Sequence, residues 1–110
     1  MQSEAELLGE SSLKNYEETR RVLQTEFYKA SEQYDNARQR AGLYNNQLSL
    51  ATKSYEIMLK SFSSSSSGLT DLLRFRQQIL DYELKKIEAL SDLNTAVAWF
   101  ERLMALSPVN

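Results

Sequence analysis

Ser61-Phe62-Ser63-Ser64-Ser65-Ser66-Ser67-Gly68 is the only low-complexity run in this chain of 110 residues, and it decides the fold. Serine side chains compete for backbone hydrogen bonds and glycine tolerates positive φ, so the run interrupts a helix rather than extending one. The hydrophobic pattern on both sides of it is long, regular and helical. The sequence therefore predicts a single all-α domain over residues 1–110, a long antiparallel coiled-coil hairpin with its tip at about 62–70.

The first helix is expected over about residues 4–62. Its apolar residues follow one another in alternating steps of three and four, interrupted once by Arg20. Such a heptad seam, sustained over about seven repeats, is typical of a coiled coil. Gly9 and Gly42 weaken the helix locally without ending it. The seam consists of Leu13, Tyr16, Leu23, Phe27, Ala30, Tyr34, Ala37, Ala41, Tyr44, Leu48, Ala51, Tyr55, Met58 and Phe62.

The tip is expected over residues 63–69 and the second helix over about 70–106. Ser67 or Thr70 can cap the beginning of this helix, and Asp71 then lies in its first turn, where the helix dipole favours negative charge. Pro108 disfavours helix at the residue before it, so the helix should end near Leu106. Its seam is Leu72, Phe75, Ile79, Tyr82, Lys86, Ala89, Leu93, Ala96, Phe100 and Leu103.

Each helix carries further apolar residues outside its seam. We call the set on the second helix the long stripe: Leu73, Leu80, Ile87, Leu90, Val97 and Met104. The set on the first helix is the short stripe: Leu43, Leu50 and Ile57. A helix with one partner shows one narrow stripe, and each buried apolar side chain is worth roughly 1.5–3 kcal/mol. The stripes therefore predict neighbours beyond the hairpin, with the long stripe as an oligomer seam.

The two helices also differ in length. At about 1.5 Å per residue the first would be about 85–90 Å long and the second about 55 Å. Paired from the tip, the second helix ends opposite roughly Thr25. The first two dozen residues then lack a partner within the chain, although Leu13, Tyr16 and Leu23 continue the pattern. Their partner is expected to be another chain or an absent part of the same protein.

Composition excludes several classes of function. The chain has 13 Lys and Arg against 15 Asp and Glu, a net charge of -2 with the signs interspersed, which argues against binding nucleic acid. It contains no cysteine and no histidine, which excludes thiolate zinc sites and His-based nucleophile systems. The carboxylates converge with no base, nucleophile or metal set; examples are Glu17, Glu18, Glu83 and Asp92. We therefore expect no enzyme activity, cofactor or metal.

No run of about 18 apolar residues is present, so no helix is expected to span a membrane. The start, Met1-Gln2-Ser3-Glu4, lacks the basic and then apolar pattern of a signal peptide. The chain is therefore expected either to be cytoplasmic or to be a piece of a larger protein.

Three stretches and the polar tip together resemble the C-terminal repeat of TolC-like outer-membrane efflux proteins; the stretches are 51–56 (ATKSYE), 71–74 (DLLR) and 89–96 (ALSDLNTA). That family shows an aromatic helix end, a short Gly/Ser-containing tip, an Asp-[Leu/Val]-Leu start and an Ala-rich returning helix. The resemblance covers about residues 10–106. It departs from the family at the tip, where Ser65 stands in place of the usual glycine and the glycine comes later, at Gly68.

In such proteins a trimer forms a β-barrel in the outer membrane, continued across the periplasm by a long α-helical barrel. The resemblance implies that this chain is one periplasmic hairpin of that barrel, soluble by itself, touching a membrane only through absent β-strands, in a Gram-negative bacterium. The implied partners are further copies and a periplasmic adaptor protein of an efflux pump. The implied adaptor-docking tip is Phe62, Ser63, Ser64, Ser65, Ser66, Ser67, Gly68, Leu69 and Thr70. Asp71 and Arg74 are the candidates for the channel entrance, although many members carry another polar or acidic group at the place of Arg74.

Alternatives remain open at each feature. The serine run is a docking tip, an inert turn or a designed linker. Asp71 and Arg74 contribute to a gate, or form an i,i+3 surface ion pair worth only a few tenths of a kcal/mol. The whole chain is an element of an efflux or secretion channel that opens like an iris at the tip, or a soluble coiled-coil scaffold that binds partner helices.

Overall fold

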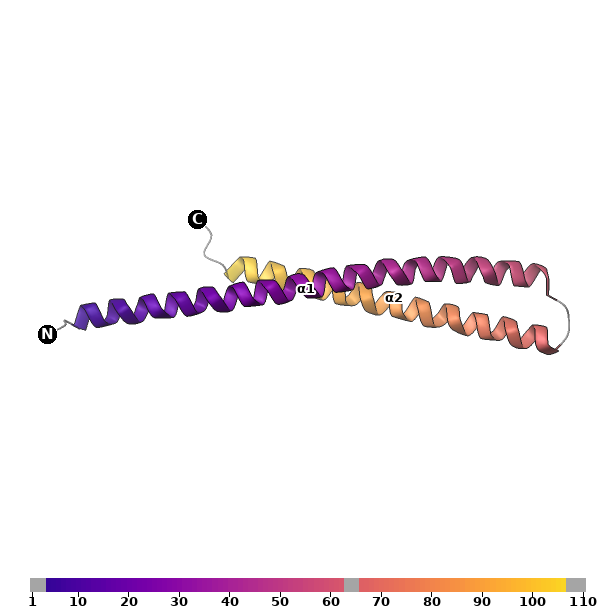
Figure 1. Cartoon of the computed structure of the whole chain (residues 1–110), viewed down its shortest axis with the longest axis horizontal. Coiled ribbons are helices and arrows are strands. Elements are labelled where there is room, and N and C mark those ends of the chain that lie inside the picture. Colours follow the sequence, from indigo (N-terminus) through magenta and orange to yellow (C-terminus); the bar gives the residue numbers. More distant parts are fainter. Residues whose placement is uncertain (1–3, 63–65, 107–110) are drawn as a thin grey trace.

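The computed structural model describes residues 4–62 and 66–106, and these form two helices. Helix α1 covers Glu4–Lys60 and helix α2 covers Ser66–Leu106. They lie antiparallel in a rod with extents of 94 × 24 × 14 Å (Figure 1). The predicted all-α fold, a long helical hairpin, is confirmed.

The helix ends at the tip differ from the expected ones. Helix α1 ends at Lys60 instead of about Phe62, although Ser61 N–H still donates to the Ile57 carbonyl at 3.2 Å. Helix α2 begins at Ser66 rather than at about Thr70, so the expected tip residues 66–69 are helical. Serine is common at the beginning of a helix, because its hydroxyl oxygen can accept a hydrogen bond from a backbone N–H group of the first turn. Within this turn the Thr70 hydroxyl donates to the Ser66 carbonyl at 3.0 Å.

The helices contact each other along the predicted seam. Every seam residue from Leu23 to Met58 on α1, and from Leu72 to Leu103 on α2, is buried or half-buried. Alanine lets the backbones approach closely but buries little apolar area, so this core is thin for its length. The most deeply buried residues are Ala30, Ala37, Ala51, Leu72, Ile79, Ala89, Ala96 and Leu103.

Three contacts fix the register of the two helices. The Phe100 ring lies between the rings of Phe27 and Tyr34, with centroids 6.2 and 6.1 Å away. Nearer the tip, Arg40 Nη2 donates to Asp92 Oδ2 at 2.8 Å, as a partly exposed salt bridge worth about 0–1 kcal/mol. The aromatic contacts therefore carry more of the stability, and the ion pair marks which residues lie side by side.

A cation also lies over the seam on the tip side of that ion pair. The Lys85 ammonium is 5.7 Å from the centre of the Tyr44 ring. This distance is within the range of a cation–π contact. The antiparallel register is thus maintained over the middle of the rod, because the α1 residue nearer the tip, Tyr44, contacts an earlier residue of α2, Lys85, than Arg40 does.

Helix α1 runs unbroken through both of its glycines, as expected. A methyl group added at Gly42 would meet no atom within 4 Å. We predict that Gly42→Ala raises the free energy of unfolding by about 0.5–1 kcal/mol, because alanine loses less backbone entropy in a helix. Urea unfolding followed by circular dichroism measures this gain.

Gly9→Ala is the matched control, since a methyl group at Gly9 is also unobstructed. Gly9 lies in the part of α1 that α2 does not reach, so its replacement should raise the helical signal without moving the unfolding midpoint of the hairpin. Equal midpoint shifts for both variants would contradict this division of the rod.

The first part of α1 extends beyond the end of α2 (Figure 1). We call residues 6–22 the overhang, and every one of them is exposed. The seam residues Leu13 and Tyr16 are 59% and 58% exposed. Among the described residues, the expectation that the start of the first helix lacks a partner within the chain is confirmed for most of the overhang, whereas Leu23, which was included in that expectation, is half-buried.

Candidate interaction surface

The long stripe lies on the outside of α2. All six of its residues are exposed, from 39% at Val97 to 62% at Leu73 and Ile87. They alternate along α2 with buried seam residues: Ile79 is 3% exposed and its neighbour Leu80 is 45% exposed. The hairpin therefore leaves the predicted oligomer seam uncovered over nearly the whole length of α2.

The short stripe is likewise exposed on α1. Leu43, Leu50 and Ile57 are each more than half exposed. They lie in the half of α1 that is nearer the tip, and the seam residues beside them are buried or half-buried. Each helix of the hairpin thus presents two apolar faces, one of which is occupied by the other helix.

The two stripes lie on opposite flanks of the hairpin. The ion pair between Arg40 and Asp92 marks one flank. Leu43 follows Arg40 by three residues, which rotates its side chain only about 60° away, so the short stripe lies on this flank. Leu90 precedes Asp92 by two residues, a rotation of about 200°, so the long stripe lies on the opposite flank.

The predicted docking tip is described only in part. Ser63, Ser64 and Ser65 lie outside the described residues. Phe62, two residues past the end of α1, and Leu69, in the first turn of α2, are both exposed. A small hollow of about 120 Å³ lies between the helix ends here, lined by Met58, Ser61, Phe62, Gly68, Asp71 and Leu72. The rest of the tip comprises Ser66 and Ser67, which are exposed, Gly68, which is half-buried, and Thr70, which is exposed.

The predicted channel-entrance residues are both exposed in the first turns of α2. In the part of the chain that the structure describes, neither Asp71 nor Arg74 takes part in a salt bridge; the ion pair there is the one between Arg40 and Asp92. The alternative i,i+3 ion pair between Asp71 and Arg74 is not formed in this structure. Both side chains are exposed near the tip, and Asp71 also lines the small hollow there.

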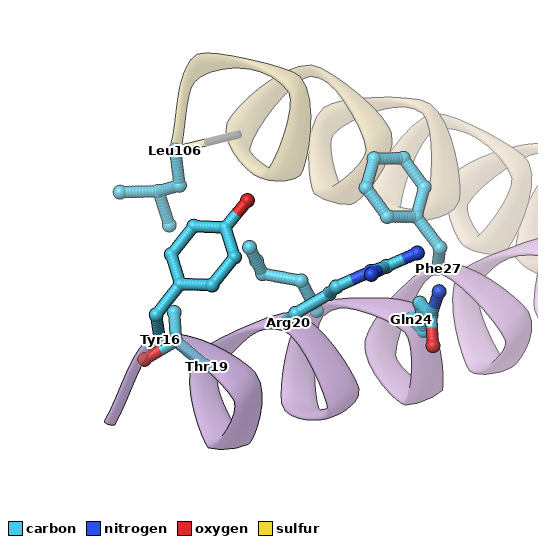
Figure 2. Close-up of a pocket in the computed structure, with 7 residues that line it drawn as sticks. Tyr16, Thr19, Arg20, Gln24, Phe27 and Leu106 are labelled. Atoms are coloured by element: carbon cyan, nitrogen blue, oxygen red, sulfur yellow. The ribbon is translucent and has the colours of Figure 1, made fainter. Parts of the chain in front are cut away.

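A groove lies at the other end of the hairpin, where α2 stops. It has a volume of about 410 Å³ and is mostly apolar. Figure 2 shows the Tyr16 ring standing between α1 and Leu106, with Arg20 extending along the floor toward Phe27. The groove is lined by Tyr16, Thr19, Arg20, Leu23, Gln24, Phe27 and Leu106. Arg20, which interrupts the seam pattern, brings a cation into this groove.

Several of these features were missed in the sequence. The pairing of Arg40 with Asp92 was not predicted. Each of these residues directly precedes a seam residue, and this shared position beside the seam is the signal that could have revealed the pair. Trp99 was assigned to neither face; it is half-buried beside a surface hollow that it lines with Thr95, Ala98 and Arg102. Leu106 was expected only as a helix end.

The titratable side chains of the described residues can be compared with the requirements of a metal site. No group of three or more His, Cys, Asp and Glu side chains among them could hold a metal ion. The Tyr28 hydroxyl is hydrogen-bonded to the Glu32 carboxylate one turn away, and this bond, the adjacent charge and slight burial raise the pKa of Tyr28 above 10.0. The described helices contain no segment with both the length and the apolar character that crossing a membrane requires.

Comparison with known proteins gives no match to a protein family, to a curated protein or to a solved structure. The candidate surfaces therefore rest on the geometry of this chain: two exposed stripes on opposite flanks, a groove at the base and a polar tip.

Proposed function

We propose that this chain is a structural element of the periplasmic helical barrel of a TolC-like outer-membrane efflux or secretion channel. The stretches 51–56, 71–74 and 89–96, which carry the resemblance to that family, all fall within the two helices. In this proposal the hairpin stands parallel to the axis of the duct. The chain acts by assembly, and it performs no chemistry.

The observation that carries the proposal is the presence of two exposed apolar stripes on opposite flanks. A hairpin that only pairs with itself needs neither stripe. An element of a closed wall needs both, because every helix in such a wall contacts a neighbour on each side. Burying a whole stripe removes several apolar side chains from water, each worth roughly 1.5–3 kcal/mol.

The tip has two roles in the proposal. Phe62 and Leu69 offer exposed apolar side chains to a periplasmic adaptor, within a setting of hydroxyl groups. Asp71 and Arg74 contribute charge at the channel entrance, where relative movement of the hairpins opens the duct like an iris. Their lack of an ion pair with each other leaves both charges available to neighbours.

The proposal predicts where the gene product that carries this chain is found. Expressed in a Gram-negative cell, it should be recovered with the outer membrane and run as a trimer in mild detergent. Fractionation followed by sedimentation measures both properties. Leu80→Glu should dissociate the trimer, because it places a charge in the long stripe.

Leu84→Glu is the matched control. Leu84 is exposed on the same helix but lies outside the long stripe, so its replacement should leave the trimer intact. Recovery of the wild-type protein in the soluble fraction would overturn the proposal. So would a trimer that tolerates Leu80→Glu as well as Leu84→Glu.

The groove at the base favours a second candidate function. A helix from a partner protein, lying antiparallel to α1, could continue the line of α2 past Leu106 and pack against Tyr16, Leu23 and Phe27. The chain would then be a soluble coiled-coil scaffold that binds partner helices. Recovery in the soluble fraction is the result that this candidate predicts.

A further inference from the structure

The groove at the base continues the seam between the two helices. Helix α2 ends at Leu106, which lines the groove together with Leu23 of α1. Beyond this level the seam residues Tyr16 and Leu13 are 58% and 59% exposed. The surface that α2 covers along the hairpin therefore extends uncovered along the overhang, over about 25 Å at about 1.5 Å per residue.

The period of this uncovered surface fits a helix. Leu13, Tyr16, Arg20 and Leu23 follow one another in steps of three and four, so they lie on one face of α1. A helix antiparallel to α1 and in the line of α2 repeats there the packing that the hairpin already uses. A chain as short as residues 107–110 spans at most about 14 Å, which is too little to cover the overhang. The occupant is therefore a separate helix.

Arg20 determines the charge that this helix must bring to the centre of the groove. Its side chain extends along the floor toward Phe27 (Figure 2). In the part of the chain that the structure describes, Arg20 takes part in no salt bridge. A helix over the groove removes the guanidinium from water, where an unpaired charge is strongly destabilising, whereas a carboxylate pairs with it through two hydrogen bonds. The groove is therefore complementary to an aspartate or glutamate at the level of Arg20.

The two edges of the groove differ in charge. Glu10 and Glu17 stand on one edge, and they line a surface hollow there together with Lys14, which lies further around α1. Ser12 and Thr19 stand on the other edge, and all four edge residues are exposed. One edge is thus acidic and the other carries hydroxyl groups. A complementary helix carries lysine or arginine along one side only.

A second copy of the overhang is a poor occupant, because it brings glutamates together. If two overhangs lie antiparallel with Leu13 of one beside Tyr16 of the other, Glu10 of one copy comes level with Glu17 of the other. A shift of one heptad in either direction brings Glu17 level with Glu17, or Glu10 level with Glu10. Like charges that face each other at the edge of a coiled coil are destabilising. The edges therefore favour a helix of different sequence.

We infer that the base of the rod binds a helix of a partner protein, antiparallel to α1, with a carboxylate against Arg20 and basic side chains against Glu10 and Glu17. The partner helix meets Leu13 and Tyr16 with apolar residues. This inference rests on the second candidate function, the scaffold, for the source of the helix, and it adds the charges by which the partner is recognised. It uses neither stripe and no residue of the tip.

Two synthetic peptides test the charge assignment. Each has about 20 residues, because isolated helices shorter than roughly 12–15 residues are marginal in water. Both carry leucine level with Leu13, Tyr16 and Leu23, and lysine level with Glu10 and Glu17. Level with Arg20, one carries glutamate and the other glutamine. Titration calorimetry at low ionic strength should show that the chain binds the glutamate peptide about tenfold more tightly, because a hydrogen bond between charged groups is stronger than one to a neutral amide.

Substitutions in the chain show whether Arg20 is the source of this preference. Arg20→Gln should bind the two peptides equally. Arg21→Gln is the matched control, since Arg21 is exposed beside it but does not line the groove, and it should keep the preference. Equal affinity of the wild-type chain for both peptides would overturn the carboxylate assignment. Failure of both peptides to bind would overturn the groove as a helix site.

The place and direction of binding have their own readouts. Tyr16→Glu should abolish binding of the glutamate peptide, whereas Leu80→Glu, on the long stripe, should leave it unchanged; the reverse result would overturn the inference. The chain contains no cysteine, so Gly9→Cys offers a single thiol near the end of the rod. It should form a disulfide with a cysteine at the C-terminal end of the peptide. A dominant product with a cysteine at the N-terminal end would overturn the antiparallel arrangement.

The inference and the scaffold function can fail separately. If neither peptide binds while the parent gene product is recovered in the soluble fraction, the inference is wrong and the scaffold function stands. If the peptides bind as expected while the gene product is recovered with the outer membrane, the scaffold function is wrong and the charge-selective groove stands.

Discussion

Replacing Ile79 by glutamate is expected to unfold the hairpin, whereas the same change at the adjacent Leu80 should leave it folded. Ile79 is 3% exposed in the seam between the helices. The change removes a buried side chain and places a carboxylate in apolar surroundings, a combined loss of about 4 kcal/mol. Because the core is thin, a loss of this size should abolish most of the helical circular dichroism at 25 °C.

Leu80→Glu is the matched control, since it carries the same substitution one residue further along α2 but on the exposed long stripe. It should keep the helical signal and lower self-association measured by sedimentation. Ile87→Glu should behave like Leu80→Glu. Equal loss of helicity at Ile79 and Leu80 would refute the assignment of the two faces of α2.

Phe100→Ala is expected to produce the second largest effect, a loss of about 3 kcal/mol in the free energy of unfolding. The Phe100 ring contacts both Phe27 and Tyr34, and the fully buried Ala30 leaves room for it between them. Truncation leaves a void that alanine cannot fill, in the part of the rod closest to the end of α2. Urea unfolding followed by circular dichroism measures the loss.

Phe100→Leu is the control for this prediction. Leucine keeps most of the apolar volume, so its cost should stay below about 1.5 kcal/mol. If the alanine and leucine variants unfold at the same urea concentration, the aromatic contacts do not stabilise the hairpin and the register that they define is wrong.

The seam could be predicted from the sequence because a period of three and four is a strong signal when it is sustained. Alanine and tyrosine alternate in it where leucine is more usual, yet Ala37, Ala51 and Ala89 are among the most deeply buried residues. The period depends on helical geometry alone, so it survives these unusual side chains. The same period predicted the exposed stripes.

The helix ends at the tip could not be predicted to the residue. Serine and glycine disfavour the interior of a helix but are accepted in its first turn, so Ser66, Ser67 and Gly68 fit either a loop or a helix start. Composition alone does not distinguish these states. The difference of four residues in the start of α2 follows from this ambiguity.

The features that depend on register were the hardest to foresee. The Arg40–Asp92 pair joins residues 52 positions apart in the sequence, and their contact requires the relative height of the two helices. The groove beside Leu106 likewise depends on where α2 stops relative to Tyr16 and Phe27. Periodicity identifies the faces of each helix separately, and it leaves their relative height unspecified.

Because of the overhang, the backbone hydrogen bonds at the two ends of the rod are expected to open at different rates. The overhang extends a helix that is already formed, so it needs no new nucleus, but most of it has no described residue of α2 packed along it and depends on intrinsic helix propensity, which is marginal in water. Residues 6–22 should therefore fray and exchange their amide hydrogens long before the middle of the hairpin does. A neighbour that lies along the overhang would suppress this fraying, so amide protection at the base would report assembly while the tip remained unchanged.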